Sequence, residues 1–227
     1  KGDISFKDVW FAYNDEDWVL KGLSLDVKSG ESLALVGATG AGKTSVINLL
    51  SRFYEYSKGS IALDGQDIRN INTSDLRNHV GVVLQDVFLF SDTVHNNITI
   101  NNKEITREQV IEAAKAVGAH EFIMKLPNDY DYNVRERGAM LSAGQRQLIS
   151  FIRAYVYNPA ILILDEATSS IDTESEEIIQ HAISKLTENR TSIIIAHRLA
   201  TIQKATNILV MDAGKLVEHG SHSELLA

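Results

Sequence analysis

The chain contains no cysteine, so disulfides, thiolate metal sites and a cysteine nucleophile are excluded. Positive charge is scarce: 22 lysines and arginines stand against 30 aspartates and glutamates, and the net charge is −8. Binding along a nucleic-acid backbone needs clustered basic residues and is therefore not expected. No apolar run reaches the length of about 18 residues that a membrane span requires, and no signal peptide is visible.

The length of 227 residues fits one large domain or one domain with an insert, and a hydrophobic content of 44% is enough for a sizeable core. The sequence begins at Lys1 rather than at a methionine. We therefore expect a segment of a longer protein, whose other parts could carry membrane spans.

Short apolar runs at 32–36, 80–84, 161–164, 192–195 and 208–211 predict buried strands, and helical patterns lie between several of them. Such alternation favours an α/β fold with a mainly parallel core sheet. Residues 4–13, 23–27 and 60–68 predict further strands, the last as a hairpin. From about 91 to 158 helical patterns dominate. Capping boxes predict helix starts at Thr106–Gln109, Thr173–Glu176 and Ser221–Glu224.

Residues 37–44 (GATGAGKT) fit the phosphate-loop pattern G-x-x-x-x-G-K-[ST], between a predicted strand and a predicted helix. Glycines let the backbone wrap around phosphates, and the successive N–H groups supply positive potential. Lys43 can reach the β- and γ-phosphates, and Thr44 can ligate Mg²⁺. The candidate nucleotide-binding residues here are Gly37, Thr39, Gly40, Ala41, Gly42, Lys43, Thr44 and Ser45.

Two carboxylates, Asp165 and Glu166, follow an aliphatic strand. Burying them there is costly unless they have partners or a chemical role. Asp165 is the expected Mg²⁺ carboxylate, and Glu166 is the candidate base for the attacking water. The alternative is a pair that caps the following turn. A small GTPase would carry Asn-Lys-x-Asp, whereas the nearest match, at 102–105, lacks the Asp.

The pentapeptide LSAGQ at 141–145 resembles the signature sequence of ATP-binding cassette (ABC) ATPases, usually LSGGQ. The resemblance extends over essentially the whole chain. Tyr13 stands at the adenine-stacking position, Gln85 in the Q-loop, and His197 in the switch motif AHRL. Residues 166–172 (EATSSID) match the stretch that contains the D-loop. The resemblance implies a RecA-like P-loop NTPase core formed by 1–90 and 159–227 with an N-terminal antiparallel β subdomain, and an inserted helical subdomain at 91–158.

The same resemblance implies roles. Tyr13 stacks on adenine; Gln85 contacts Mg²⁺ or water; His197 contacts the γ-phosphate, with Glu166 and Gln85 as catalytic partners. Thr44, Gln85 and Asp165 would hold Mg²⁺. Simpler readings stay open: an edge aromatic for Tyr13, a strand-end polar residue for Gln85, and a helix cap for Asp172. The residues expected to act across a head-to-tail dimer are Ser142, Ala143, Gly144, Gln145 and Asp172.

Finer features are similar to exporters of this family: the segment from Gln85 to Asn97, and RERG at 135–138. These segments, including Glu136, imply contacts with transmembrane domains, and the resemblance implies an ATP-hydrolysing exporter domain at the cytoplasmic face of the cell membrane. The alternatives are an importer ATPase or a non-transport member that acts in DNA repair or translation. Ala143 and Arg135 replace usual glycines, and the altered signature suggests a heterodimer.

Overall fold

The computed structural model describes residues 1–166 and 171–227, which divide into two compact units. The first comprises Lys1–Val82, Pro159–Glu166 and Asn189–Ala227. The second comprises Val83–Asn158 and the described part of Ala167–Glu188. Residues 167–170, in the interior of the predicted D-loop stretch, lie outside the described residues.

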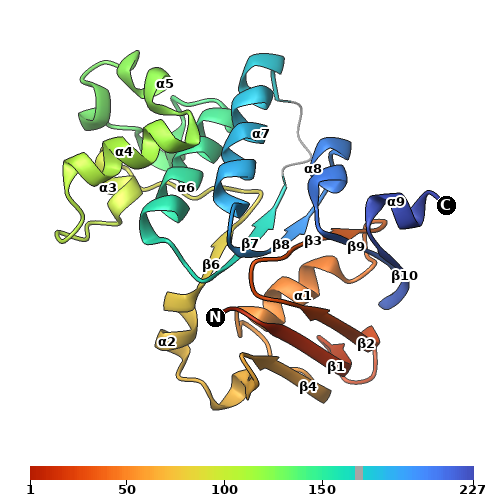
Figure 1. Cartoon of the computed structure of the whole chain (residues 1–227). Coiled ribbons are helices and arrows are strands. Elements are labelled where there is room, and N and C mark those ends of the chain that lie inside the picture. Colours follow the sequence, from red (N-terminus) through yellow and green to blue (C-terminus); the bar gives the residue numbers. More distant parts are fainter. Residues whose placement is uncertain (167–170) are drawn as a thin grey trace. The chain divides into compact units, whose positions relative to one another are not determined.

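The first unit contains an antiparallel sheet with the strand order β2-β1-β4-β5 (Figure 1). Its strands are β1 (Ile4–Ala12), β2 (Trp18–Val27), β4 (Lys58–Leu63) and β5 (Gln66–Asp67). Alternate side chains of β1, such as Ile4 and Phe6, are buried, as the period of two requires. The predicted N-terminal antiparallel β structure is therefore confirmed.

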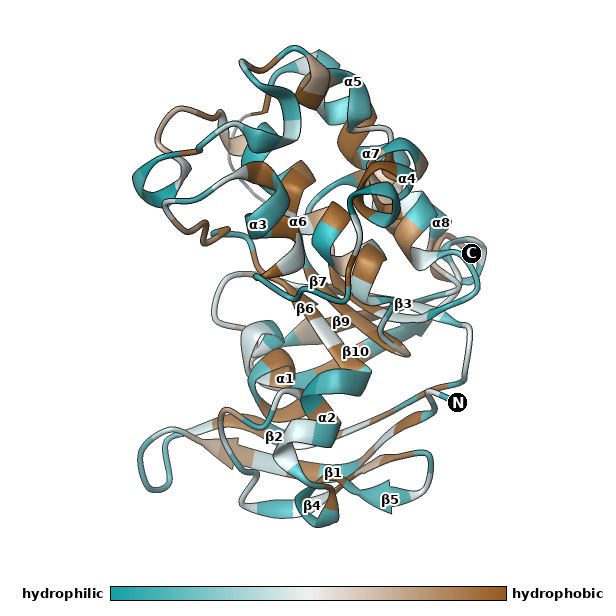
Figure 2. Ribbon diagram, turned by 90° about the vertical axis from the view of Figure 1, so that its left-hand side faces the viewer, coloured by the Kyte–Doolittle hydropathy of each residue, from teal (hydrophilic) through white to brown (hydrophobic). Residues whose placement is uncertain are grey.

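A second sheet has the order β10-β9-β3-β8-β7-β6. Its strands are β3 (Ser32–Val36), β6 (Val80–Val83), β7 (Ile161–Asp165), β8 (Thr191–Ile195), β9 (Asn207–Asp212) and β10 (Lys215–Gly220). β3 runs parallel to both β8 and β9, and β7 runs parallel to β8, whereas β10 is antiparallel to β9. The aliphatic runs of β7 and β8 are buried on both faces, as parallel sheets require. The part of this sheet around the labels β7, β6 and β9 is largely brown, that is hydrophobic, in Figure 2. The α/β class with a mainly parallel core sheet is confirmed.

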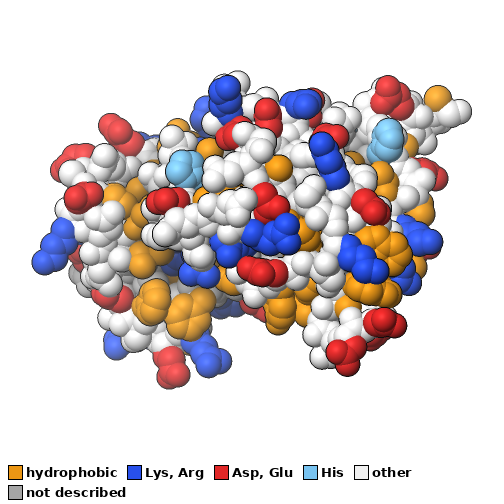
Figure 3. All heavy atoms as spheres, turned by 90° about the horizontal axis from the view of Figure 1, so that it is seen from below, with side chains coloured by type: hydrophobic (Ala, Val, Ile, Leu, Met, Phe, Trp, Pro, Cys, Tyr) orange, Lys and Arg blue, Asp and Glu red, His pale blue; other side chains and the backbone are white. Residues whose placement is uncertain are grey.

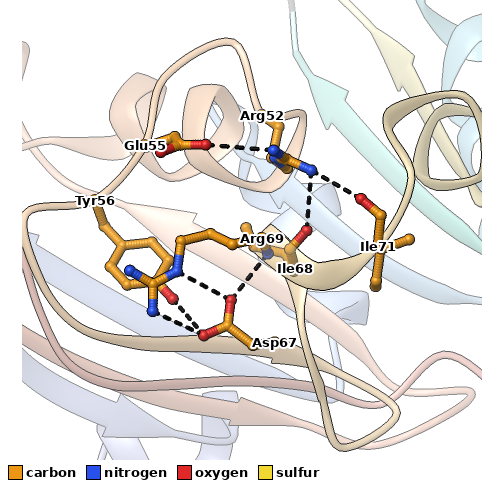
Figure 4. A network of polar contacts seen from close by, with 7 residues as sticks. All are labelled: Arg52, Glu55, Tyr56, Asp67, Ile68, Arg69 and Ile71. Carbon is orange, nitrogen blue, oxygen red and sulfur yellow. Dashed lines mark hydrogen bonds and ion pairs between the residues drawn. The ribbon is translucent and has the colours of Figure 1, made fainter.

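The helices of the first unit are α1 (Lys43–Leu50), α2 (Thr73–His79), α8 (Leu199–Lys204) and α9 (His222–Leu225). A polar network around Asp67 stabilises the hairpin of β4 and β5, which follows α1 in the chain (Figure 4). Asp67 accepts hydrogen bonds from the Tyr56 hydroxyl at 2.8 Å and from the backbone and guanidinium N–H groups of Arg69. Arg52 donates to the carbonyls of Ile68 and Ile71 at 3.3 and 2.8 Å.

The second unit is helical. It contains α3 (Val94–Thr99), α4 (Arg107–Val117), α5 (His120–Met124), α6 (Ala143–Tyr157) and α7 (Thr173–Thr187), with short 3₁₀ turns at Asp129–Asp131 and Glu136–Gly138. α6 packs against α3, α4 and α7. Its apolar residues Leu148, Ile149, Phe151 and Ile152 are buried, which makes α6 the central helix of this unit.

Two of the predicted capping boxes are present, at Thr106–Gln109 before α4 and at Ser221–Glu224 before α9. The third capping box, at Thr173–Glu176, is wrong, and the alternative reading of Asp172 as a helix cap is confirmed, because Asp172 is the N-cap of α7. The Asp172 carboxylate accepts from the Ser175 backbone N–H at 2.9 Å. Aspartate is a stronger N-cap than threonine, so the preceding residue takes the position. The Ser175 N–H also lowers the pKa of Asp172.

Among the helices of the described residues, none combines the length and the apolar character needed to cross a bilayer. On the face drawn in Figure 3, acidic and basic side chains are interspersed and hydrophobic groups lie between them.

Candidate nucleotide-binding site

The phosphate loop, the acidic pair and the switch histidine follow three parallel strands of one sheet. In the register of these strands, Leu35 of β3 and Asp165 of β7 both pair with Ile195 of β8. The strands therefore end level with one another. The segments that begin at Gly37, Glu166 and Ala196 leave the sheet at its carboxyl edge, where α/β proteins bind their ligands.

Two glycines of the loop at 37–44 are required by its geometry. A Cβ atom on Gly37 would lie 2.3 Å from the backbone oxygen of Met211, so no side chain fits there. Gly42, the N-cap of α1, has φ +104°, a conformation that residues with a Cβ rarely adopt. The loop is thus held close to β9 on one side and enters the helix on the other.

Lys43 is 8% exposed, and its ammonium donates a hydrogen bond to the Gly37 carbonyl oxygen. Burial lowers the pKa of Lys43, and the nearby Asp165 carboxylate counteracts part of that effect. Lys43 and Asp165 are therefore close enough to interact. Of the remaining candidates in the loop, Thr39, Gly40 and Thr44 are exposed, whereas Ala41, Gly42 and Ser45 are buried.

Tyr13 is 42% exposed, and its ring makes edge contacts with Phe11 and Tyr54, with ring centroids 4.7 and 4.9 Å apart. Its hydroxyl lies 3.1 Å from Ser45 Oγ and accepts from the Asn48 side chain at 2.9 Å. Tyr13, which follows β1, is thereby hydrogen-bonded to α1, the helix that follows the phosphate loop.

Glu166 is fully buried, and its carboxylate accepts hydrogen bonds from three residues in the described part of the chain. The backbone N–H groups of His197 and Arg198 donate to Oε2 at 2.7 and 2.9 Å, and the Thr201 hydroxyl donates to Oε1 at 2.5 Å. The Arg198 guanidinium lies 3.5 Å from Oε1. The sequence predicted a strand-end acid here but not these partners.

Asp165, at the end of β7, is half-buried, and the His197 side chain is exposed. Gln85 is half-buried, follows β6 by two residues and belongs to the second unit. The structure therefore gathers the loop at 37–44, Asp165, Glu166 and His197 within the first unit.

The pentapeptide at 141–145 forms the start of α6 in the second unit. Ser142 is the N-cap, and it exchanges hydrogen bonds with Gln145 in a capping box. Ala143 is the first helical residue, so its Cβ carries no backbone penalty. Gly144 is tightly placed, because a Cβ there would lie 3.1 Å from the Ser175 side chain and 3.3 Å from that of Ile171.

Arg135, which stands where the resemblance to ABC ATPases leads us to expect a glycine, has φ +64° and ψ −173°. This region of the backbone map belongs almost entirely to glycine, so the arginine is strained. Arg135 and the neighbouring Glu136 are exposed. No local sequence pattern predicts this backbone conformation for an arginine.

A buried amide organises the segment between Gln85 and Asn97. Asn97 is fully buried; its side chain accepts from the Phe90 backbone N–H at 2.8 Å and donates to the carbonyls of Phe90 and Thr93. Phe88 and Phe90 stay 58% and 50% exposed, and their rings meet edge to face at 5.0 Å. The sequence singled out this segment but not the function of Asn97 in holding it.

The fold and the loop together define a P-loop nucleotide-binding domain. The family model described as "ABC transporter" matches residues 20–169. The chain therefore belongs to the ABC transporter family, as its ATP-binding domain, and ATP hydrolysis is the activity characteristic of this domain.

Individual relatives agree. The chain is 49% identical over 226 residues to "Probable multidrug resistance ABC transporter ATP-binding/permease protein YheH" of Bacillus subtilis, covering 100% of this chain and 34% of the relative. It is also 49% identical over 226 residues to "Uncharacterized ABC transporter ATP-binding protein YknV" of the same organism, covering 100% and 37%.

A solved structure, "Structure of a bacterial Atm1-family ABC exporter with ATP bound", matches with a TM-score of 0.92 and 42% identity, over 100% of this chain and 40% of that one. The chain spans only 34% to 40% of the length of these proteins.

Proposed function

We propose that this chain is the ATP-hydrolysing domain of an exporter, and that ATP binding and hydrolysis drive transport by attached transmembrane domains. The main support is the placement of the phosphate loop, Asp165, Glu166 and His197 at one edge of the parallel sheet. The relatives, which are described as a permease and an exporter, support the link to transport.

In this proposal the loop at 37–44 binds the phosphates of ATP. Its backbone N–H groups and the start of α1 offer positive potential, and Lys43 contributes a full charge. The half-exposed ring of Tyr13, fixed through its hydroxyl, provides a surface for the adenine. A stacking contact of this kind is worth roughly 1–3 kcal/mol in other base-binding proteins.

A magnesium ion fits the donors available, because the Thr44 hydroxyl and the Asp165 carboxylate are hard oxygen ligands next to the phosphate loop. Gln85 would add an amide oxygen. When bound, the ion neutralises phosphate charge during the transfer. Within the described residues, no cluster of three or more His, Asp or Glu side chains forms a metal site of another type.

For hydrolysis we assign Glu166 as the base and His197 as a contact to the γ-phosphate. Glu166 takes a proton as the water oxygen bonds to the γ-phosphorus, while the bond from that phosphorus to the bridging oxygen of ADP breaks. The exposed His197 side chain can donate to the γ-phosphate oxygens, which bear much of the charge in the transition state.

We further propose a head-to-tail dimer, in which the start of α6 closes over ATP held by a second ABC domain. Ser142 and the N–H groups that follow it would face that partner's γ-phosphate, with Gly144 and Gln145 beside them. Asp172 would lie at the dimer contact in addition to capping α7. A heterodimer is the form suggested by Ala143, and mass measurement of the native complex would identify the second domain.

The attached transmembrane domains would contact the segment from Gln85 to Asn97 and the exposed Glu136. The exposed rings of Phe88 and Phe90 suit an apolar partner surface. The domain would then work at the cytoplasmic face of the cell membrane, below the spans that it drives.

The decisive experiment is the ATPase rate of a Glu166→Gln variant of the whole protein. General-base catalysis contributes about 10²- to 10⁴-fold, so the rate should fall by at least 100-fold while ATP binding persists. Glu218→Gln, which changes an exposed glutamate on β10, is the matched control and should keep the wild-type rate. Hydrolysis at the wild-type rate by Glu166→Gln would overturn the assignment of the base.

A further inference from the structure

The carboxylate of Glu166 is enclosed by a short segment of the chain. Both of its oxygens accept hydrogen bonds from the segment 197–201, and the side chain has no exposed surface. The 2.5 Å separation from the Thr201 hydroxyl lies in the range of a strong O–H···O⁻ bond. Thr201 is itself only 3% exposed.

A general base must reach the proton that it removes, within about 2.6–3.2 Å. A fully buried carboxylate with both oxygens engaged does not meet a water molecule at the γ-phosphate. In the observed arrangement Glu166 is therefore retracted. Either its side chain or the segment 197–201 must move before it can act.

The three donors differ in kind. Two are backbone N–H groups, of His197 and Arg198, which every residue type except proline supplies. The third is the Thr201 hydroxyl, which depends on the side chain at this position. The free energy that favours the retracted position of Glu166 therefore depends on the side chain at residue 201.

We propose that Thr201 is a positioning residue for the catalytic base: its hydroxyl stabilises the retracted position of Glu166. It thereby limits the fraction of domains in which the base faces the water. Because the His197 N–H binds the same carboxylate, release of Glu166 also frees the backbone at the switch histidine. This proposal rests on the assignment of Glu166 as the base.

The test compares Thr201→Val with wild type in the whole protein. Valine keeps the shape but loses the hydroxyl. Hydrogen bonds to charged groups are worth about 1.5–3 kcal/mol, which is a factor of ten or more in the equilibrium between positions. We expect kcat for ATP hydrolysis to rise about threefold to tenfold, up to the point at which another step limits the rate, with KM for ATP unchanged.

Thr201→Ser retains the hydroxyl and should restore a kcat close to wild type. Thr187→Val is the control, since the Thr187 hydroxyl donates to the carbonyls of Ile183 and Ser184 within α7 and its loss should leave kcat unchanged. Amide hydrogen exchange gives a second readout: the N–H groups of His197 and Arg198 should exchange faster in Thr201→Val. If the valine variant does not fold, Thr201→Ala removes the same hydroxyl.

An unchanged kcat would overturn the proposal. A lower kcat that Thr201→Ser restores would also overturn it, because Thr201 would then hold Glu166 in its working position. Failure here is distinct from failure of the proposed base. If Glu166→Gln is inactive and Thr201→Val shows no rise in kcat, only the positioning proposal fails. If Glu166→Gln is active, the assignment of the base, on which the positioning proposal rests, is wrong.

Discussion

Replacement of Asp67 by asparagine tests the polar network in Figure 4. The side-chain hydrogen bonds from Arg69 contribute most to holding the pKa of Asp67 at about 2, below the ordinary value of 3.8. One pKa unit corresponds to about 1.4 kcal/mol, so the shift corresponds to roughly 2.5 kcal/mol of folding free energy. The Asp67 side chain is 25% exposed, and solvent screening reduces this to an expected loss of about 1–2 kcal/mol in Asp67→Asn.

The pH dependence has a definite sign. The pKa of Asp67 is lower in the folded state than in the unfolded state, so its stabilising contribution is fully present above about pH 4. It is lost as the pH falls from there toward the folded pKa of about 2. The difference between wild type and Asp67→Asn should therefore be largest near pH 6 and should shrink below pH 4.

Urea unfolding of both proteins at pH 6 and at the lowest pH where both still fold measures this difference. Asp26→Asn, on β2 at the opposite edge of the same sheet, is the control: Asp26 is exposed, and its replacement should change stability little at either pH. A stability difference for Asp67→Asn that stays constant across this pH range, or that is absent at pH 6, would refute the reasoning.

Two further substitutions test the strained backbone at Arg135 and the hydrogen bonds that position Tyr13. Arg135→Gly should raise the unfolding free energy by about 1 kcal/mol, because glycine relieves the positive-φ strain at a smaller entropic cost, and an unchanged or lower stability in urea would contradict this. Tyr13→Phe keeps the ring but loses the hydroxyl bonds to Ser45 and Asn48, so ATP should bind about threefold to tenfold more weakly by calorimetry. Equal affinity would mean that the hydroxyl does not help to position the adenine surface.

Much of the fold was predictable because the strands and turns obey local rules. The runs at 161–164 and 192–195 form central parallel strands, because consecutive apolar residues in a strand must be buried on both faces of the sheet. The loop at 37–44 was also predictable, because its glycines indicate a backbone conformation that residues with a Cβ rarely adopt. At residues 172–173 the sequence offered two adjacent N-caps. The capping box at Thr173 is wrong and the cap at Asp172 is confirmed, because relative capping strength decides between them.

The placement of the candidate site residues was predictable from the sequence, but their contacts were not. The phosphate-loop pattern and the acidic strand end make Lys43, Asp165 and Glu166 candidates from their spacing. The engagement of Glu166 by Thr201, 35 positions away, depends on how β7 and β8 align in the sheet. The anchoring of Tyr13 by Asn48 likewise joins distant segments, and no local pattern encodes either contact.

The amide of Asn97 has a thermodynamic consequence for the segment that carries Phe88 and Phe90. A loop that must be ordered when it meets a partner loses conformational entropy, about 1–2 kcal/mol for each residue whose backbone becomes fixed. Here the backbone from Phe90 to Thr93 is already fixed by one buried side chain. In the proposed docking, a partner that contacts the Phe90 ring would not have to order this backbone, so a smaller apolar contact area would be enough for stable binding.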